Sequence, residues 1–249
     1  MRILFITNLT RQANMMDKTL KQLALSADFP AGDAVMADPR ASWSDEWKTQ
    51  LSNATVTLIS WMGSSSDSKL IQQSLKLLRE SGKPYLLMGS GVDQEDTSQG
   101  FAVADIETVN RYLLFSGQHN YRNLWRWLAG RFCGHEEKTG EPQELPWSGI
   151  INLRDNQRIA TLGDYKRQGW LKPERLTVGL LIPRDEWIWG DLKHQRLLVK
   201  TLMERELNVI PVFSHWAADP LQQSTGVDTA IETYFRDESG WIVDVVINT

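Results

Sequence analysis

The segment from position 184 to position 191 holds the residues of this chain that are best suited to bind a ligand. Its sequence, RDEWIWGD, places Arg184, Glu186, Trp187, Gly190 and Asp191 within eight positions. An arginine can hold a carboxylate, an indole ring can stack on a planar ligand, and carboxylates accept hydrogen bonds from amides. This composition predicts a concave substrate-binding site.

A structured turn is the alternative interpretation of the same residues. In it, Asp191 caps the following helix and Arg184 pairs with a neighbouring acid. The capping role accounts for Asp191 but leaves Trp187 and Trp189 unexplained, because large aromatic side chains normally pack against or bind something. The sequence leaves both interpretations open.

His215 is the remaining candidate for substrate contact. Two apolar runs, 176–182 and 208–213, predict buried strands, and His215 lies just beyond the second while Arg184 follows the first. Open α/β sheets bind their ligands beyond the carboxyl ends of the strands. We therefore expect His215 to lie at the same edge of the sheet as the 184–191 segment.

Motifs for phosphate-bearing cofactors or nucleophilic catalysis are missing from the sequence. It contains no G-x-S-x-G, no G-x-x-x-x-G-K-[ST] and no G-x-G-x-x-G. The segment 88–91 (MGSG) follows an apolar run but reads as a turn, and 63–67 (GSSSD) reads as the cap of the next helix. We assign no catalytic residue and no cofactor to this chain.

A metal site is not expected either. Cys133 and His135 are close in sequence, with Glu136 and Glu137 beside them, but a C-x-H pair is not a zinc-binding spacing. These residues read as solvated side chains of a linker. His194 lies in a predicted helix among polar neighbours and reads as a surface residue.

Two successive α/β blocks are expected to position these residues. In the first, short apolar runs alternate with amphipathic helical patterns, as in a parallel, flavodoxin-like sheet. The expected strands of this block are 2–8, 33–37, 55–61 and 84–89, and its last helix is 121–132. The second block is expected to run strand 176–182, helix 191–206, strand 208–213, helix 226–236 and strand 241–247. Residues 147–164 read as irregular.

The expected domain boundaries follow from composition. We predict an α/β domain over 1–134, a Gly-, Glu- and Pro-rich linker over 135–146, and the start of a second α/β domain over 147–249. Only three strands are expected in the second sheet, which is fewer than a doubly wound domain usually has. We therefore expect that domain to be incomplete at its carboxyl end and the chain to be part of a longer protein.

Composition restricts the location and partners of the protein. The formal net charge of −4 argues against binding to nucleic acid. No apolar run approaches the ~20 residues of a membrane-spanning helix, and the first residues do not resemble a signal peptide. The single cysteine fits a reducing compartment. We expect a cytoplasmic protein that does not contact membranes.

Several segments, in order, resemble the amino-terminal region of the cobaltochelatase large subunit (CobN) and the magnesium chelatase H subunit. The segments that carry the resemblance are 117–124 (GQHNYRNL), 146–150 (PWSGI), 162–165 (LGDY), 178–181 (VGLL) with Arg184, Trp187 and Gly190, 207–213 (LNVIPVF) and 243–249 (VDVVINT). Gln118, Glu186 and Asp191 depart from the family's pattern. The match covers about the second half of the chain.

The resemblance implies the large, tetrapyrrole-binding subunit of an ATP-dependent metal chelatase. Such a subunit holds a corrin or porphyrin and the divalent metal, Co²⁺ or Mg²⁺, while AAA+ ATPase and integrin-like partner subunits hydrolyse ATP with Mg²⁺. The family's metal-handling residues are expected beyond Thr249, so this chain by itself is expected to be non-catalytic. The alternative is a stand-alone small-molecule binding protein with two flavodoxin-like halves, which a stop codon directly after Thr249 would favour.

Overall fold

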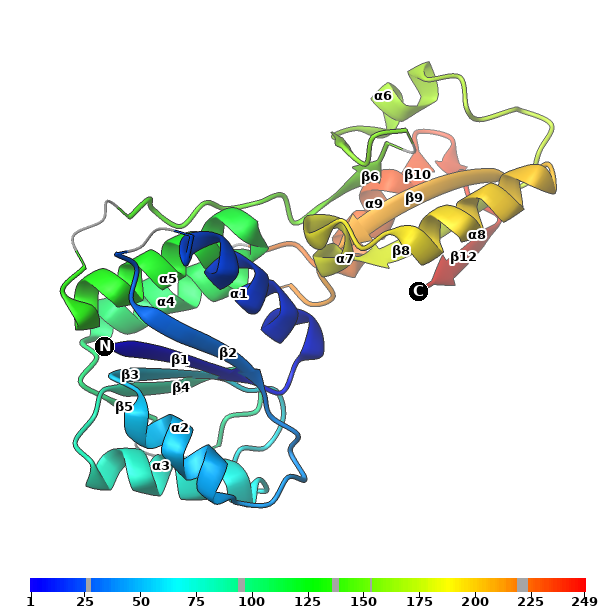
Figure 1. Ribbon diagram of the computed structural model, residues 1–249. Helices are drawn as coiled ribbons and strands as arrows, with labels where there is room; N and C mark the ends of the chain where they lie inside the picture. Colours follow the sequence, from blue (N-terminus) through cyan, green and yellow to red (C-terminus); the bar gives the residue numbers. More distant parts are fainter. Residues whose placement is uncertain (26–27, 94–96, 136–138, 153, 219–223) are drawn as a thin grey trace. The chain divides into compact units, whose positions relative to one another are not determined.

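The computed structural model describes residues 1–25, 28–93, 97–135, 139–152, 154–218 and 224–249. The chain divides into two compact units, Met1–Glu144 and Leu145–Thr249 (Figure 1). Each unit contains a mostly parallel sheet with helices on its faces, which confirms the expectation of two α/β blocks. Among the described residues, no helix is long and apolar enough to cross a membrane.

The first unit is built on a five-stranded sheet with the order β2-β1-β3-β4-β5. Its strands are β1 (Arg2–Thr7), β2 (Ala31–Met36), β3 (Val56–Ser60), β4 (Tyr85–Met88) and β5 (Ser98–Gln99). The first four are parallel and lie where the apolar runs predict them, and the short β5 pairs antiparallel with β4. The order 2-1-3-4 is that of flavodoxin-like sheets, whose ligand crevice opens where β1 and β3 diverge.

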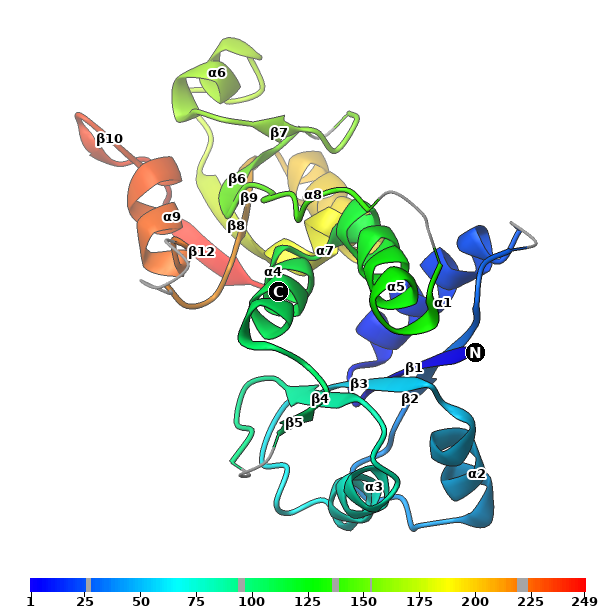
Figure 2. The ribbon, with the colours of Figure 1, turned by 90° about the vertical axis from the view of Figure 1, so that its left-hand side faces the viewer.

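Five helices cover the two faces of this sheet. They are α1 (Thr10–Leu23), α2 (Asp45–Asn53), α3 (Lys69–Glu80), α4 (Val103–Phe115) and α5 (Gly117–Cys133). Figure 2 shows α2 and α3 on one face and α1, α4 and α5 on the other. α2 and α4 have no counterpart among the helices predicted from the sequence. Ser68 is the cap of α3 and accepts a hydrogen bond from the amide of Ile71, so the cap lies one residue beyond the predicted 63–67 segment.

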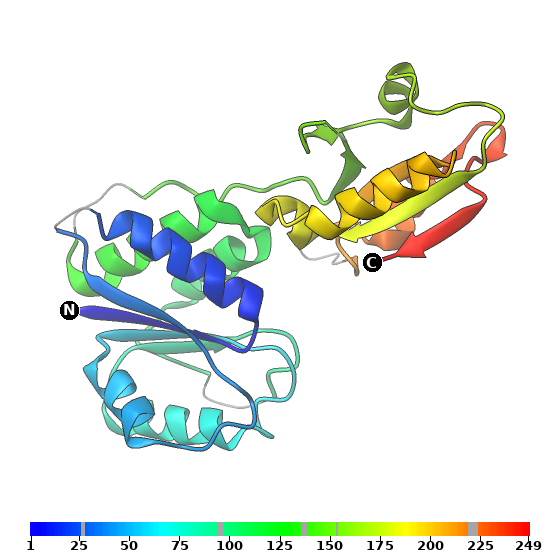
Figure 3. The same ribbon diagram turned by 45° about the vertical axis from the view of Figure 1, so that its right-hand side comes forward.

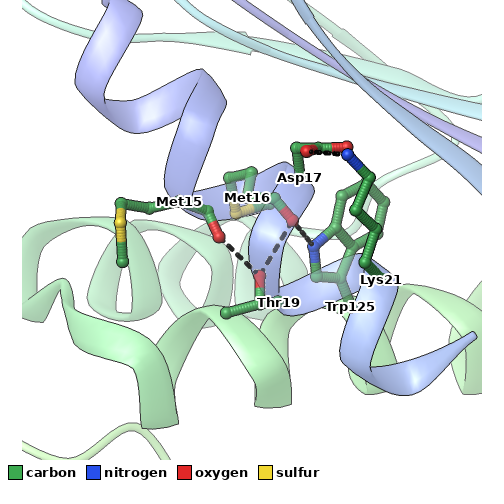
Figure 4. Close-up of polar contacts among 6 residues, drawn as sticks. All are labelled: Met15, Met16, Asp17, Thr19, Lys21 and Trp125. Carbon is green, nitrogen blue, oxygen red and sulfur yellow. Dashed lines mark hydrogen bonds and ion pairs between the residues drawn. The ribbon is translucent and has the colours of Figure 1, made fainter. Parts of the chain in front are cut away.

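A buried tryptophan joins α5 to α1 in the first unit (Figure 4). The ring of Trp125 is fully buried, and its Nε1 donates a hydrogen bond to the carbonyl oxygen of Met16 at 3.0 Å. The hydroxyl of Thr19 donates to the same oxygen at 2.9 Å. On the outer surface of α1, Lys21 pairs with Asp17 at 2.6 Å. Trp125 is therefore a structural residue of the first unit.

The second unit also has a five-stranded sheet, with the order β12-β8-β9-β6-β7. Its strands are β6 (Ser148–Ile151), β7 (Arg158–Ile159), β8 (Thr177–Pro183), β9 (Asn208–Ser214) and β12 (Val245–Asn248). The expected strands β8, β9 and β12 are parallel. The prediction that 147–164 is irregular is wrong, because β6 pairs antiparallel with β9 and with β7. A small hairpin of β10 (Arg236–Asp237) and β11 (Gly240–Trp241) precedes the last strand, which therefore begins only at Val245.

Helices cover both faces of the second sheet, as its apolar strands require. They are α6 (Leu162–Arg167), α7 (Arg184–Trp189), α8 (Lys193–Glu204) and α9 (Val227–Tyr234). Figure 3 shows α8 running along one face, with α9 on the other. Leu192 and Val199 pack on the α8 side, whereas Ala230, Tyr234 and Phe235 pack on the α9 side.

Candidate functional site

The carboxyl ends of β8 and β9 lie side by side, and the residues predicted to contact a ligand gather there. Pro183 at the end of β8 pairs with Ser214 at the end of β9, so Arg184 and His215 follow neighbouring strands. The 184–191 segment is not an open turn. It forms the short helix α7, which ends at Gly190 in the left-handed conformation with φ of 68°.

Arg184 is buried, with 2% of its surface exposed, and its side chain fastens the start of the second unit to this edge. Its Nε donates to the carbonyl of Pro146 at 2.9 Å, and its Nη2 donates to the carbonyl of Leu145 at 3.0 Å. The guanidinium carbon lies 4.4 Å from the ring centre of Trp147, within cation–π range. These contacts give Arg184 a structural role at the edge of the sheet.

His215 belongs to the same stack. Its ring meets Trp147 edge to face, with ring centres 5.5 Å apart, and its Nδ1 lies 2.9 Å from the carbonyl oxygen of Ala217. The backbone amide of His215 donates to the carbonyl of Trp147. The structure therefore brings two of the predicted residues, Arg184 and His215, against a tryptophan that the sequence analysis did not select.

Trp187 lies on the α8 side of the sheet rather than in this stack. Its ring is parallel to that of Phe213, with centres 3.9 Å apart and an interplanar angle of 4°. Its Nε1 donates to the carbonyl of Asn156 at 2.9 Å. One face of the indole thus packs against the core, and its Nε1 has a hydrogen-bond partner. The side chain as a whole is half-buried.

The two acids of the segment have different environments. Glu186 accepts a hydrogen bond from Nε2 of Gln195 in the first turn of α8. Asp191 is exposed, and its amide donates to the carbonyl of Glu186 at 2.9 Å. The proposed capping role of Asp191 is wrong, because α8 begins after Leu192 and has no side-chain cap. Gly190 places the chain in the left-handed conformation that separates the two helices.

A groove beside α8 was missed by the sequence analysis. It has a volume of about 610 Å³, and its lining includes Asn156, Gly190 and four basic residues of α8. These are Lys193, His194, Arg196 and Lys200. The spacing of the basic residues along one helix face was the available signal, but the contribution of Asn156 from a distant loop was not visible in the sequence.

The first unit holds an anion cradle that is filled by one of its own side chains. The carboxylate of Asp93 accepts hydrogen bonds from the hydroxyls of Ser64, Ser65 and Ser66 and from the amides of Ser65 and Ser66, at 2.6 to 3.1 Å. These bonds, above all those from Ser66, hold the pKa of Asp93 well below its usual range. The GSSSD segment thus binds an internal carboxylate at the end of β3.

The described residues contain no group of three or more His, Cys, Asp and Glu side chains that could hold a metal ion. Cys133 is buried, and burial raises the pKa of its thiol. Its predicted neighbours Glu136 and Glu137 lie outside the described residues.

Comparison with known proteins identifies the family of this chain. Residues 110–249 match the model of the CobN/Magnesium Chelatase family. The chain belongs to this family. The match starts within α4 and includes the whole second unit with its β8–α7–α8–β9 edge.

Two curated proteins are similar to this chain over a little more than half of its length. The chain is 28% identical over 146 residues to an uncharacterised protein of Methanocaldococcus jannaschii, covering 57% of this chain and 11% of that protein. It is 26% identical over 145 residues to the magnesium chelatase H subunit of Cereibacter sphaeroides, covering 55% of this chain and 11% of that protein. The chain therefore spans about a tenth of the length of these relatives.

A solved structure, the catalytic subunit of cobaltochelatase from Mycobacterium tuberculosis, is also similar to this chain. The TM-score is 0.49 at 14% sequence identity, over 88% of this chain and 17% of that one.

The CobN-like segment 117–124 has a structural role in this family member. Asn120 donates to the carbonyl of Gln143 at 2.8 Å, and its own Oδ1 accepts from the amide of Gln143. Asn123 accepts from the amide of Gly140 at 3.3 Å. The hydroxyl of Tyr112 donates to the carbonyl of Gly140, and burial raises the pKa of this tyrosine to about 12. The asparagines thus fix the path of the chain just before the second unit begins.

Proposed function

We propose that this chain is the amino-terminal region of the large, tetrapyrrole-binding subunit of an ATP-dependent cobalt or magnesium chelatase. The observation that carries the proposal is the family match over residues 110–249. The similarity to the H subunit of a magnesium chelatase supports it. The pathway is cobalamin or chlorophyll-type biosynthesis, in the cytoplasm.

In this proposal the chain contributes binding or docking and not catalysis. ATP, Mg²⁺ and the inserted metal are handled by the complete complex, with AAA+ ATPase and integrin-like subunits as partners. The missing G-x-x-x-x-G-K-[ST] motif supports this division of work. The macrocycle is a corrin or porphyrin, which the second unit contacts at the β8–β9 edge through the segment from Arg184 to Asp191 and through His215.

A fluorescence titration tests the binding part of the proposal. We expect hydrogenobyrinic acid diamide or protoporphyrin to quench tryptophan emission saturably. A Trp187→Phe variant keeps the aromatic stack on Phe213 but removes one of the two indoles of the segment, so the quenching should decrease. Trp241→Phe is the control, because Trp241 is 58% exposed on the distant β11 strand.

Tetrapyrrole binding and docking to partner subunits are tested by different experiments. Absence of saturable quenching with either macrocycle would refute tetrapyrrole binding by this chain. Size-exclusion chromatography with the ATPase and integrin-like subunits tests docking, and an unshifted elution of the chain with both would refute that part.

A further inference from the structure

The α8 groove has a volume of about 610 Å³ and is lined by basic side chains, although the formal net charge of the chain is −4. Lys193, Arg196 and Lys200 follow the spacing i, i+3, i+7, which places them on one face of a helix. At ~1.5 Å of rise per residue, the first and the last are roughly 10 Å apart along the axis. Several anionic groups of one ligand can therefore be contacted at once.

Arg196 is held in position by Asn156, which is in the left-handed conformation. Its Nε donates to Oδ1 of Asn156 at 3.0 Å, which leaves the two terminal nitrogens of the guanidinium without a hydrogen-bond partner among the described residues. Asn156 itself has φ of 63°, a left-handed conformation in which few side-chain-bearing residues occur. Its carbonyl is fixed by Trp187 and its amide by Asn152. Such preorganisation favours binding, because less side-chain freedom is lost when the ligand arrives.

The other basic side chains of the groove differ in whether they have an acidic partner. Lys193 and His194 are exposed and have no acidic partner among the described side chains. Lys200 lies 3.7 Å from Glu204, which does not line the groove. Asp191 is the acid nearest to Lys193 in the sequence, but it does not line the groove.

A buried polar atom lies next to the groove. Gln195 is only 8% exposed, and its Oε1 has no hydrogen-bond partner among the described residues. It lines a cavity of about 20 Å³ that shares Asn156, Leu192 and Arg196 with the larger groove. Because buried acceptors are nearly always paired, and because a cavity of this size holds about one water molecule, a ligand in the groove can reach Oε1 through a single water.

We propose that the α8 groove is a binding site for a small organic anion with at least two carboxylate or phosphate groups and one hydrogen-bond donor. Arg196 binds one anionic group through its terminal nitrogens, and Lys193 binds a second. The donor of the ligand bonds to a water, which in turn donates to Oε1 of Gln195. The groove shares Gly190 with the 184–191 segment but contains no residue of the Arg184–Trp147–His215 stack, and binding of the anion does not depend on the tetrapyrrole proposal.

Isothermal titration calorimetry of the full chain at low ionic strength tests the site with citrate and pyrophosphate. These two probes distinguish a carboxylate ligand from a phosphate ligand. Saturable binding of either one is expected. Arg196→Gln should weaken it by about tenfold or more, because two charge-assisted hydrogen bonds are lost. Arg205→Gln is the matched control, since it removes the same charge from the exposed carboxyl end of the same helix.

Two further comparisons test positioning and the donor. Asn156→Gly tolerates the left-handed backbone and keeps every cation, but it frees Arg196, so binding should weaken by a smaller factor than in Arg196→Gln. Tricarballylate, which is citrate without its hydroxyl, should bind less tightly than citrate. Equal affinities for these two would remove Gln195 from the site. No binding of citrate or pyrophosphate at millimolar concentration, or equal weakening by Arg196→Gln and Arg205→Gln, would overturn the proposal.

Discussion

Replacing Arg184 with methionine separates its structural role from a role in ligand binding. The side chain donates two hydrogen bonds, at 2.9 and 3.0 Å, and lies 4.4 Å from the ring centre of Trp147. Hydrogen bonds from a charged group contribute about 1.5–3 kcal/mol each, and a cation–π contact adds about 1 kcal/mol. Methionine keeps part of the apolar stem, and loss of the buried charge recovers its desolvation cost.

We therefore expect the variant to lower the free energy of unfolding of the second unit by about 3 kcal/mol. With a urea dependence of about 2 kcal/mol per molar, this corresponds to a midpoint shift of about 1.5 M. Arg184→Lys keeps the charge but loses the forked geometry, so we expect about half of the effect. Arg205→Met should change stability by less than about 0.5 kcal/mol, because that side chain is exposed.

Hydrogen exchange with mass spectrometry locates the effect. Protection should fall in β6 and at the end of β8, because Arg184 connects the segment before β6 to β8. The reasoning is refuted if Arg184→Met unfolds with the midpoint of Arg205→Met. If that variant is stable but loses affinity for a carboxylate-bearing macrocycle, Arg184 acts as a ligand contact instead.

Three further changes test other parts of the structure. Gly179→Ala should destabilise the second unit by about 1–3 kcal/mol in urea unfolding, because the added Cβ would lie 2.7 Å from two ring atoms of buried Phe235. Asp93→Asn should lower stability at pH 7, and its difference from the parent protein should shrink steadily as the pH falls from about 4 to about 2. The folded pKa of Asp93 is lowered, so its contribution is present above the unfolded pKa of about 4 and is lost as the pH falls towards the folded value. A constant gap between Asp93→Asn and the parent protein over this pH range would contradict the cradle. Trp125→Phe should cost about 2 kcal/mol in the first unit, because a buried ring becomes smaller and a hydrogen bond to Met16 is lost, and an unchanged thermal midpoint would contradict this.

Features that depend on neighbouring residues in the sequence were predicted well. The apolar runs at 2–8 and 208–213 predict buried parallel strands, because both faces of such strands are covered and every position must be apolar. The ordered family-like segments predict membership of the CobN/Magnesium Chelatase family, which the match over residues 110–249 shows. β6 was missed because a four-residue strand carries little periodicity of its own and depends on its pairing with β9.

At the candidate site, too, contacts between distant segments could not be predicted from the sequence. Composition selected Arg184, Trp187 and His215, but it could not give their partners, which lie far away in the sequence. Arg184 bonds to carbonyls 38 and 39 residues upstream, and Trp187 bonds to a carbonyl 31 residues upstream. Asp191 was assigned as a cap because its residue type favours that position, yet Gly190 ends α7 and α8 begins after Leu192.

The sequence by itself determined the α/β class, the strands of the parallel sheets and the family, because these rest on residue type and local spacing. Only the tertiary structure decided what the polar side chains do. Arg184 packs on Trp147, Asp93 fills the serine cradle, and Asn156 orients Arg196 beside α8. Each of these contacts joins segments about 30 to 40 residues apart, and burial and hydrogen bonding between such segments exist only after the chain has folded.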